Sequence, residues 1–483
     1  MKKILIQLIG EQTLPNIFPI LSICPDRVVN IYTQTTAKEN IKIIDWCRKY
    51  GEKYGARPKF TMYDPIGESL RETQKGIADI LRKELAKVED ASSAMLILNM
   101  TGGTKAMSAS SISYCMQISN IRKEQGLNPV PIFYLNPSAR EMEFVTCEEL
   151  RDKVLVRSPL DIRLSVQEII EAGGNTVVVS YNKNWEKVYP AAKKLRDLAD
   201  EDILFTLNES GNYKDYDVRR PLSLLLKDNN TNRLVQRVNA LKNLAAVAEK
   251  DDAVLQGFRL CGLDARDSDF YFTEEICRKV EDILSRIDNQ GMKKHQKHNL
   301  EREARHMLTG AANFLVGGWW EVMVAHAYQQ ENPQAQVLWS VETADKHDHK
   351  HAVETDIIAS DGLSLCCISC KRGLHASVMQ ELEQHCARTT MLAGLRHRRI
   401  IAVFRRDALY ELRSLSNALK LEMWDAKKVK CIEEGKPYEK KEAPTAERRG
   451  KSQEEDAKPE RIPFFKRVVS TIRILFSGKG RAS

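Results

Sequence analysis

Apolar runs and helix-period segments alternate through the first 150 residues. Short apolar runs suited to buried strands lie at 4–9, 28–32, 60–63, 94–100 and 131–135. Between them, apolar residues recur at helical spacing around 15–22, 38–53, 68–88 and 104–118. Continuous apolar strands joined by helices are typical of a parallel sheet covered on both faces. We therefore predict an α/β, Rossmann-like domain over residues 1–150, with a final hairpin strand at 141–146.

The pattern is less regular over residues 151–300. Helical periodicity marks 164–172, 185–198, 232–249 and 273–287, and a strand is predicted at 176–179. No group of residues in this stretch suggests chemistry. We interpret it as a mixed connecting region.

A second compact α/β domain is predicted over residues 301–427. A long helix at 304–328 precedes strands at 336–341, 353–359 and 363–371, followed by a helix at 377–392 and a strand at 399–404. Asp361-Gly362 is a strong two-residue turn signal between the second and third of these strands. A loop of two residues would place Asp356 opposite Cys367 and Glu354 opposite Ser369.

Charge is concentrated at the end of the chain. The chain has 74 Lys and Arg against 66 Asp and Glu, a net charge of +8, and residues 427–483 carry +7 of it. Overall basicity therefore gives no argument that the body binds nucleic acid. Residues 428–483 have the composition of a disordered tail. Within it, the apolar and basic segment 462–476 suits a membrane-surface or partner-binding helix, or an element that docks on the chain's own core.

Composition argues against two classes of protein, membrane-spanning proteins and proteins held together by a disulfide framework. No apolar run reaches the roughly 18–20 residues that a membrane-spanning helix needs, so we expect no transmembrane segment. The eleven cysteines are scattered rather than arranged as a disulfide framework. This usage indicates a cytoplasmic protein.

A phosphate-type loop follows the predicted strand 94–100. It reads Thr101-Gly102-Gly103-Thr104-Lys105 and opens a helix. Glycines at this position let backbone N–H groups face an anion, and the hydroxyls and the ammonium add donors. A turn that needs glycine only for its backbone shape explains the pattern about equally well. The spacings of the Walker and dinucleotide loops are absent.

A second polar loop, Gly10-Glu11-Gln12-Thr13, follows the first predicted strand. Ligands of open α/β sheets bind beyond the carboxyl ends of the strands, where both loops would lie. Together the two loops resemble those of the CARF (CRISPR-associated Rossmann fold) family, which senses cyclic oligoadenylates made by type III CRISPR complexes. The resemblance covers about the first third of the chain. It implies a homodimer with one ring, cyclic tetra-adenylate by family likeness, across the two-fold axis. The positions that it assigns to the ligand are Gln12, Thr13, Thr101, Gly102, Gly103, Thr104 and Lys105.

The predicted hairpin of the second domain carries a further set of polar residues. With a side-chain period of two, Glu354 and Asp356 share a face of one strand, and Ser369 and Lys371 share a face of the next. Carboxylates that bind a hard cation beside an ammonium suit metal-assisted phosphodiester hydrolysis. Glu321 follows Gly317-Gly318-Trp319-Trp320, and we expect it on the same face. A solvated polar face is the alternative, but a carboxylate among such apolar residues argues against it.

The order of helix Glu, strand Asp and strand Lys resembles the PD-(D/E)XK nuclease superfamily over about residues 301–404. The resemblance implies Asp356 as metal ligand, Lys371 as the group that orients water, Glu321 as the helical carboxylate, and magnesium or manganese as cofactor. Ser369 departs from the pattern, because an acidic residue is usual there. Glu354 and the backbone carbonyl of Cys370 are candidate replacement ligands.

The leading hypothesis is a cyclic-oligoadenylate-activated, metal-dependent endonuclease that cleaves DNA or RNA in type III CRISPR defence. Two alternatives remain. One is a non-catalytic sensor whose degenerate nuclease domain binds nucleic acid or a partner, which the serine at position 369 favours. The other is a first domain that opens its own ring ligand.

Overall fold

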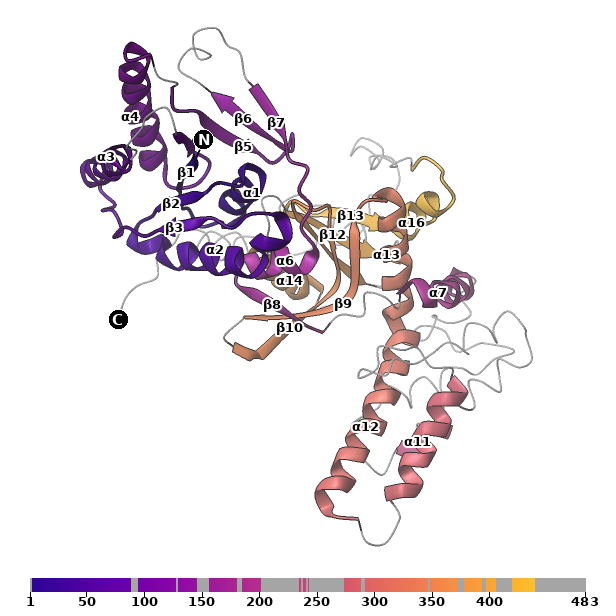
Figure 1. Cartoon of the computed structure of the whole chain (residues 1–483). Coiled ribbons are helices and arrows are strands. Elements are labelled where there is room, and N and C mark those ends of the chain that lie inside the picture. The colour runs from indigo at the N-terminus through magenta and orange to yellow at the C-terminus, as the bar shows by residue number, and fades with distance from the viewer. Residues whose placement is uncertain are drawn as a thin grey trace, which may run out of the picture. The chain divides into compact units, whose positions relative to one another are not determined.

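The computed structural model describes residues 2–87, 94–126, 129–145, 156–179, 185–200, 234–235, 238–239, 242, 273–287, 292–345, 348–371, 378–392, 397–404 and 419–438. The elements presented below belong to one compact unit, Met1–Pro437. Figure 1 shows them labelled along the chain.

The first part of the chain forms a seven-stranded sheet in the order β3-β2-β1-β4-β5-β6-β7. Strands β1 to β5 pair in parallel, whereas β6 and β7 pair antiparallel. Because β1 lies between β2 and β4, the direction in which the chain builds the sheet reverses between β1 and β4. The predicted α/β, Rossmann-like arrangement is confirmed. The strands are β1 (Lys2–Leu8), β2 (Arg27–Ile31), β3 (Lys59–Thr61), β4 (Ala94–Asn99), β5 (Ile132–Asn136), β6 (Glu141–Val145) and β7 (Val156–Pro159).

Helices cover both faces of this sheet (Figure 1). Apolar residues of α1 (Leu14–Ile23) and α2 (Ala37–Tyr50), such as Phe18 and Trp46, fill the core on one face. Residues of α3 (Leu70–Ala86) and α4 (Lys105–Glu124), such as Ile77 and Cys115, fill the core on the other. Two 3₁₀ turns, Gln34–Thr36 and Gly51–Tyr54, flank α2.

A second sheet has six strands in the order β13-β12-β11-β10-β9-β8. Strands β8 to β11 pair antiparallel, and β11, β12 and β13 pair in parallel. The strands are β8 (Asn175–Val179), β9 (Gln336–Asp345), β10 (Asp348–Ser360), β11 (Leu365–Lys371), β12 (His397–Val403) and β13 (Glu422–Asp425).

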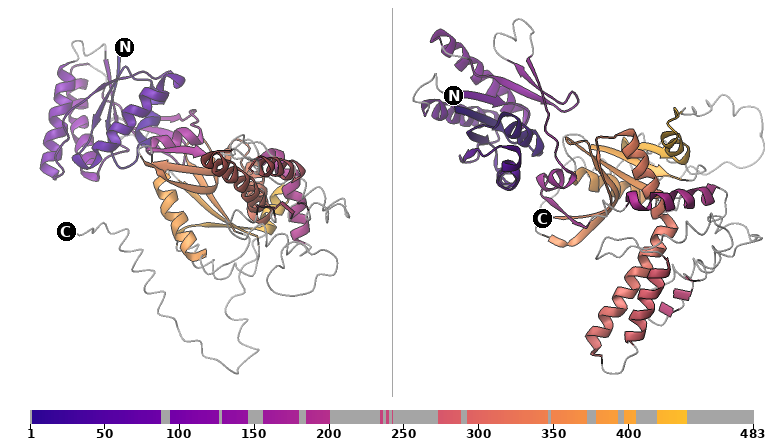
Figure 2. Two further views of the ribbon diagram at one scale, coloured as in Figure 1. Left: turned by 90° about the horizontal axis from the view of Figure 1, so that it is seen from below. Right: turned by 45° about the vertical axis from the view of Figure 1, so that its right-hand side comes forward.

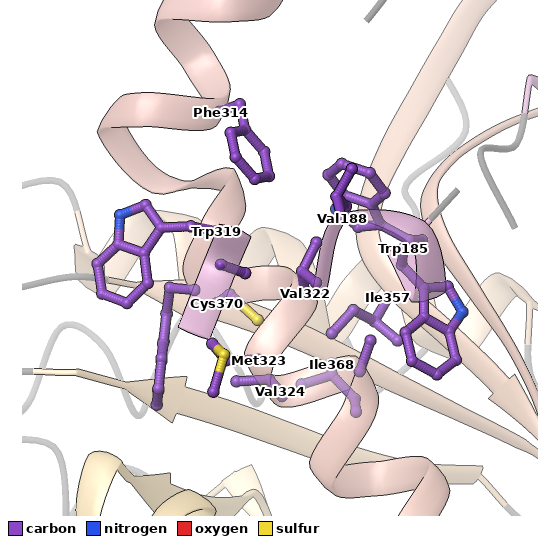
Figure 3. Packing of buried hydrophobic residues seen from close by; sticks show 14 of the residues in the cluster. Trp185, Val188, Phe314, Trp319, Val322, Met323, Val324, Ile357, Ile368 and Cys370 are labelled. Carbon is purple, nitrogen blue, oxygen red and sulfur yellow. The ribbon is translucent and has the colours of Figure 1, made fainter. Parts of the chain in front are cut away.

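The helices of this second part are α6 (Val166–Ala172), α7 (Trp185–Asp200), α11 (Thr273–Ile287), α12 (Lys294–Asn313), α13 (Trp319–Glu331), α14 (Val378–Leu392) and α16 (Ala426–Glu433). Figure 2 shows the two sheets and their helices from two other directions. Helix α13 packs Val322 and Met323 against Ile357, Ile368 and Cys370 on one face of the sheet (Figure 3). Leucine and cysteine side chains of α14 contact β12 on the other face.

Three predicted boundaries differ from the structure. The long helix predicted over 304–328 is interrupted by a π-helical turn at Phe314–Gly318, where two glycines and a change of packing partner interrupt the regular pattern. Helix α16 crosses the predicted start of the tail at 428, because Val429 is fully buried against the core that includes α13. Strand β7 extends the first sheet beyond residue 150. Most of 232–249 and all of 462–476 lie outside the described residues.

No described helix is long and apolar enough to span a membrane.

Candidate functional site

The two predicted ligand loops interlock at the carboxyl ends of β1 and β4. A side chain at Gly102 would place its Cβ 2.1 Å from the carbonyl oxygen of Leu8, and Gly103 has a φ of +78°. A Cβ at Gly10 would lie 3.0 Å from the backbone nitrogen of Gly103. Only glycine fits this close approach and this backbone shape. The loops therefore meet where the strand order reverses, the usual ligand position in open α/β sheets.

Side chains at the end of β4 fix the shape of its loop. The Asn99 amide donates to the Pro15 carbonyl at 2.9 Å, and its oxygen accepts the Thr101 N–H at 3.0 Å. The Thr101 hydroxyl in turn accepts the N–H of Leu135 on β5 at 2.7 Å. The loop is thus tied to the first helix on one side and to β5 on the other.

The residues assigned to the ligand fall into two groups by exposure. Gln12, Thr104 and Lys105 are exposed at the loops. Thr104 also caps α4, since its hydroxyl accepts the Met107 N–H at 3.2 Å. Thr13 is 6% exposed and donates to the carbonyl of Ala172, at the end of α6, at 2.7 Å. The Gln12, Thr104 and Lys105 side chains are accessible to a ligand, whereas the Thr13 hydroxyl serves a protein contact.

The predicted register of the β10–β11 hairpin was wrong by two residues. Ile357 pairs with Ile368 and Ser360 with Leu365, so the turn holds four residues instead of two. The Asp361 carboxylate accepts the N–H groups of the second and third residues after it at 2.9 and 2.8 Å, which stabilises the wider turn. A shift of two keeps each side chain on its predicted face.

Asp356 lies where β10 and β11 separate, beyond the pair Ile357 and Ile368, and we call this place the fork. The last described pair of the ladder is Ile357 with Ile368, and beyond it Asp356 Oδ2 accepts the backbone N–H of Cys370 at 2.6 Å. The Ser369 hydroxyl lies 3.3 Å from the same oxygen. In a strand, the N–H and C=O of one residue point to the same neighbour. The Cys370 carbonyl therefore faces the Asp356 side of β11.

Glu321 approaches this fork from a neighbouring helix. It lies in the first turn of α13, which covers the face formed by Ile357 and Cys370. The Asp356 charge contributes to the raised pKa of Glu321, so the two carboxylates lie near each other although they come from different elements. The Glu321 Oε2 accepts the Trp339 indole N–H at 2.8 Å.

The charges at the fork influence one another. Burial, followed by the negative charge of Asp356, raises the pKa of Glu321 to about 8. Burial also raises the pKa of Asp356, and the partly buried Lys371 ammonium opposes the shift in both carboxyls. Two carboxylates and an ammonium thus lie within electrostatic range of one another.

Glu354 is exposed at the edge of this group. Its Oε1 accepts the Ser340 hydroxyl at 2.7 Å. Ser340 has a φ of +48°, which is uncommon for a residue other than glycine and is often found near functional sites. Trp339 of β9 therefore positions Glu321, and Ser340 positions Glu354. The sequence analysis predicted neither Trp339 nor Ser340. A tryptophan and a serine inside a strand pattern carry no signal for such a role.

The donor set at the fork fits a hard divalent cation in part. Among the residues that the structure describes, no three His, Cys, Asp or Glu side chains gather closely enough to hold a metal ion. Magnesium commonly uses one or two carboxylates and fills its other positions with water and substrate phosphate. Asp356, Glu321 and the Cys370 carbonyl would supply such oxygen donors. The buried Cys370 thiol does not, since burial holds its pKa well above the ordinary range.

The turn of the β10–β11 hairpin contacts residues of the first part of the chain. The guanidinium of Arg140, in the β5–β6 turn, donates to the Asp361 carbonyl. The Leu164 N–H donates to the Gly362 carbonyl at 2.9 Å, and the Arg163 side chain packs against Gly362. The turn of the β10–β11 hairpin, at the end remote from Asp356 and Lys371, is therefore bound to the segment that follows β7.

Comparison with known proteins shows which folds this chain resembles. No curated protein matches this chain. Among solved structures, protein VC1899 from Vibrio cholerae superposes with a TM-score of 0.53 at 15% identity, covering 90% of this chain and 96% of that one. Can2 from Sulfobacillus thermosulfidooxidans, solved in complex with cyclic tetra-adenylate, superposes with a TM-score of 0.52 at 14% identity, covering 89% and 97%. Both likenesses concern the fold of nearly the whole chain, and residues 4–168 match the family model of the Card1 CARF domain.

Proposed function

We propose that this protein is a cyclic-oligoadenylate-activated, metal-dependent nuclease of type III CRISPR defence. Its first part would sense the ring as a homodimer, with cyclic tetra-adenylate as the expected ligand. The match of residues 4–168 to a CARF domain supports this proposal, as does the similar fold of Can2, which was solved with cyclic tetra-adenylate. The exposed Gln12, Thr104 and Lys105 would contact the ring phosphates.

The observation that carries the nuclease proposal is the fork between β10 and β11. It brings Asp356, the backbone of Cys370 and Lys371 together with a carboxylate from α13. Asp356, Glu321 and the Cys370 carbonyl would hold magnesium or manganese. Such an ion would neutralise phosphate charge and lower the pKa of bound water. Lys371 would orient the attacking water, and Glu354, fixed by Ser340, would complete the acidic edge.

One observation favours a second candidate, a sensor that binds nucleic acid or a partner without cleaving. Ser369 offers a neutral hydroxyl where the related nucleases have an acid, and this hydroxyl already contacts Asp356 at 3.3 Å. A site with one fewer charge binds a divalent cation more weakly. The two candidates differ in whether DNA or RNA is hydrolysed.

A cleavage assay separates the candidates. Single-stranded DNA and RNA are incubated with manganese, with and without cyclic tetra-adenylate, using wild type, Asp356→Asn and Lys371→Ala. We expect ligand-dependent cleavage that falls at least about a hundredfold in both variants. Lys59→Ala, which changes an exposed lysine of β3, is the matched control and should cleave as wild type. Ligand binding without cleavage by wild type would instead support the non-catalytic sensor.

A further inference from the structure

A row of basic residues follows one exposed face of α12. Lys294, His298 and Arg302 are spaced four residues apart, so they share a face, and Lys297 lies beside them. All four side chains are exposed. We call Lys294, Lys297, His298 and Arg302 the α12 basic stripe.

The later turns of α12 are occupied by packing. Ala304, Met307 and Leu308 are buried in the core that also contains Ile276 and Val280 of α11. Figure 1 shows α11 and α12 side by side, with the start of α12 at the end remote from α13. The later turns of α12 are thus used for the helix pair, whereas the side chains of the stripe, in the earlier turns, are exposed to solvent.

Acidic groups near the stripe are engaged elsewhere. Glu301 pairs with Arg305 at 3.7 Å, and Asp282 of α11 pairs with Arg286 at 3.6 Å. Within the described ranges, neither Lys294 nor Arg302 has a carboxylate within salt-bridge distance. A row of exposed basic residues along a helix is the electrostatic footprint of a protein that binds a nucleic-acid backbone.

The stripe is connected along the chain to the candidate site. Helix α12 leads through the turn Phe314–Gly318 into α13, whose first turn carries Glu321. At a rise of 1.5 Å per residue, Arg302 lies at most about 28 Å and Lys294 at most about 40 Å from Glu321. Since duplex DNA rises 3.4 Å per base pair, this span corresponds to about 8–12 base pairs.

We infer that the α12 basic stripe binds the phosphate backbone of the substrate within about 12 base pairs of the phosphodiester at the candidate site. The inference rests on the proposed function for its substrate class. It adds a binding surface outside both the ring-sensing loops and the fork. It also explains how a body of nearly neutral net charge can hold a polyanion, since the cations are arranged along one face.

Binding is measured without cleavage, in EDTA, on labelled DNA of 40 and 8 nucleotides, each as single strand and as duplex. The test variant is Lys294→Gln with Arg302→Gln. The matched control is Lys2→Gln with Lys59→Gln, which removes two exposed charges from the first sheet. Circular dichroism confirms that each variant is folded.

For the 40-nucleotide DNA, we expect the test variant to bind about fivefold or more weakly at 0.1 M salt. The slope of log Kd against log salt should fall by about 1.5, since each phosphate contact contributes about 0.7–0.9. The 8-nucleotide DNA is long enough to cover the stripe, which spans about 12 Å, so it should also bind the test variant more weakly. The control should match wild type on both DNAs. An unchanged slope, an equal loss in the control, or no DNA binding by wild type would each overturn the inference. Stripe-dependent binding by a protein that never cleaves would leave the inference standing and reject the nuclease proposal.

Discussion

The residues of the two predicted ligand loops differ in exposure and in what their side chains contact. Gln12 and Lys105 face solvent, so their polar groups are available to a ring phosphate. Thr13 and Thr101 use their hydroxyls within the protein, one as donor to the Ala172 carbonyl and one as acceptor for the Leu135 N–H. Substitutions in the two groups should therefore have different consequences.

Lys105→Ala should weaken cyclic tetra-adenylate binding about tenfold and leave the melting temperature unchanged, because it removes an exposed charge. Thr101→Val should instead lower the free energy of unfolding by about 1–3 kcal/mol, because it leaves the Leu135 N–H without its acceptor. Isothermal titration calorimetry and denaturant unfolding measure the two effects. Wild-type affinity in Lys105→Ala would show that this lysine does not meet the ligand.

Ser369 is a neutral residue at the fork, so an acidic residue at this position would add one negative charge to the site. Its hydroxyl lies 3.3 Å from Asp356 Oδ2, so an aspartate there would add a carboxylate beside an existing one. Ser369→Asp should lower the manganese concentration for half-maximal cleavage about tenfold and should lower the stability of the metal-free protein, because like charges repel. Metal titrations of activity and of melting temperature test this, with Ser113→Asp at an exposed position of α4 as control. A variant that needs more manganese than wild type would contradict the assigned role of the fork.

His385 gives the stability of the protein a pH dependence. The side chain is 7% exposed, and burial is the main reason that its pKa falls to about 4. The unfolded chain has a histidine pKa near 6.5, so it binds a proton that the folded protein does not between pH 6.5 and 4. Stability should therefore fall as the pH drops through that window, by on the order of 3 kcal/mol at pH 4. His385→Gln should remove this share of the slope in urea unfolding measured from pH 7 to 4. Parallel curves for variant and wild type would contradict the assignment.

At the scale of elements, the β10–β11 hairpin connects the two parts of the chain. Its open end carries Asp356 and Lys371, and its turn is bound by Arg140 and by the backbone of Leu164. The same β5 strand that leads to Arg140 donates its Leu135 N–H to Thr101 in the ligand loop. A displacement of the loop would therefore reach the turn through one strand.

Arg140→Ala should leave ring binding unchanged and reduce the ratio of ligand-stimulated to basal cleavage about fivefold, because it removes a contact between the two parts. Arg57→Ala is the control, since Arg57 forms an exposed pair with Glu52 in the first part of the chain. Cleavage rates with and without cyclic tetra-adenylate, together with calorimetric affinities, measure the ratio. An equal loss in both variants would assign the effect to general destabilisation.

Local pattern predicted most elements, while the details of the fork depended on long-range contacts. Strands β1 to β5 follow from apolar runs, and the Thr101–Lys105 loop follows from glycines between a strand and a helix, whereas β7 was not predicted. The register of β10 and β11 was missed because the Asp361 carboxylate, rather than the two-residue turn signal, fixes the turn. The break in the helix before Glu321 was missed because it is a π-helical turn, Phe314–Gly318, inside a continuous apolar stretch. Neither cause is visible in the period of the sequence.

At the scale of the molecule, α6 is bound to helices of the first part and leads directly into the second sheet. The Trp46 indole N–H on α2 donates to the Glu168 carbonyl at 2.8 Å, and the Lys53 ammonium lies 2.6 Å from the Glu168 carboxylate. Residues 175–179 then form β8, the edge of the second sheet. Helix α6 is therefore a second connection between the two sheets, beside the contacts of the β10–β11 turn.

A symmetric ring bound at the switch point predicts the stoichiometry of the active species. Each chain offers one pair of loops beyond β1 and β4, and a ring with two-fold symmetry is matched by two such pairs across an isologous interface. Calorimetry should therefore give one cyclic tetra-adenylate per two chains, and light scattering should give a dimer mass. At a free ligand concentration of 100 times Kd, the ring should stabilise the dimer by about 2.7 kcal/mol. Lys105→Ala should weaken the binding without changing the dimer mass, because the predicted contact is to the ring. A ratio of one ring per chain on a monomer would reject the shared site, and activation would then have to arise within a single chain.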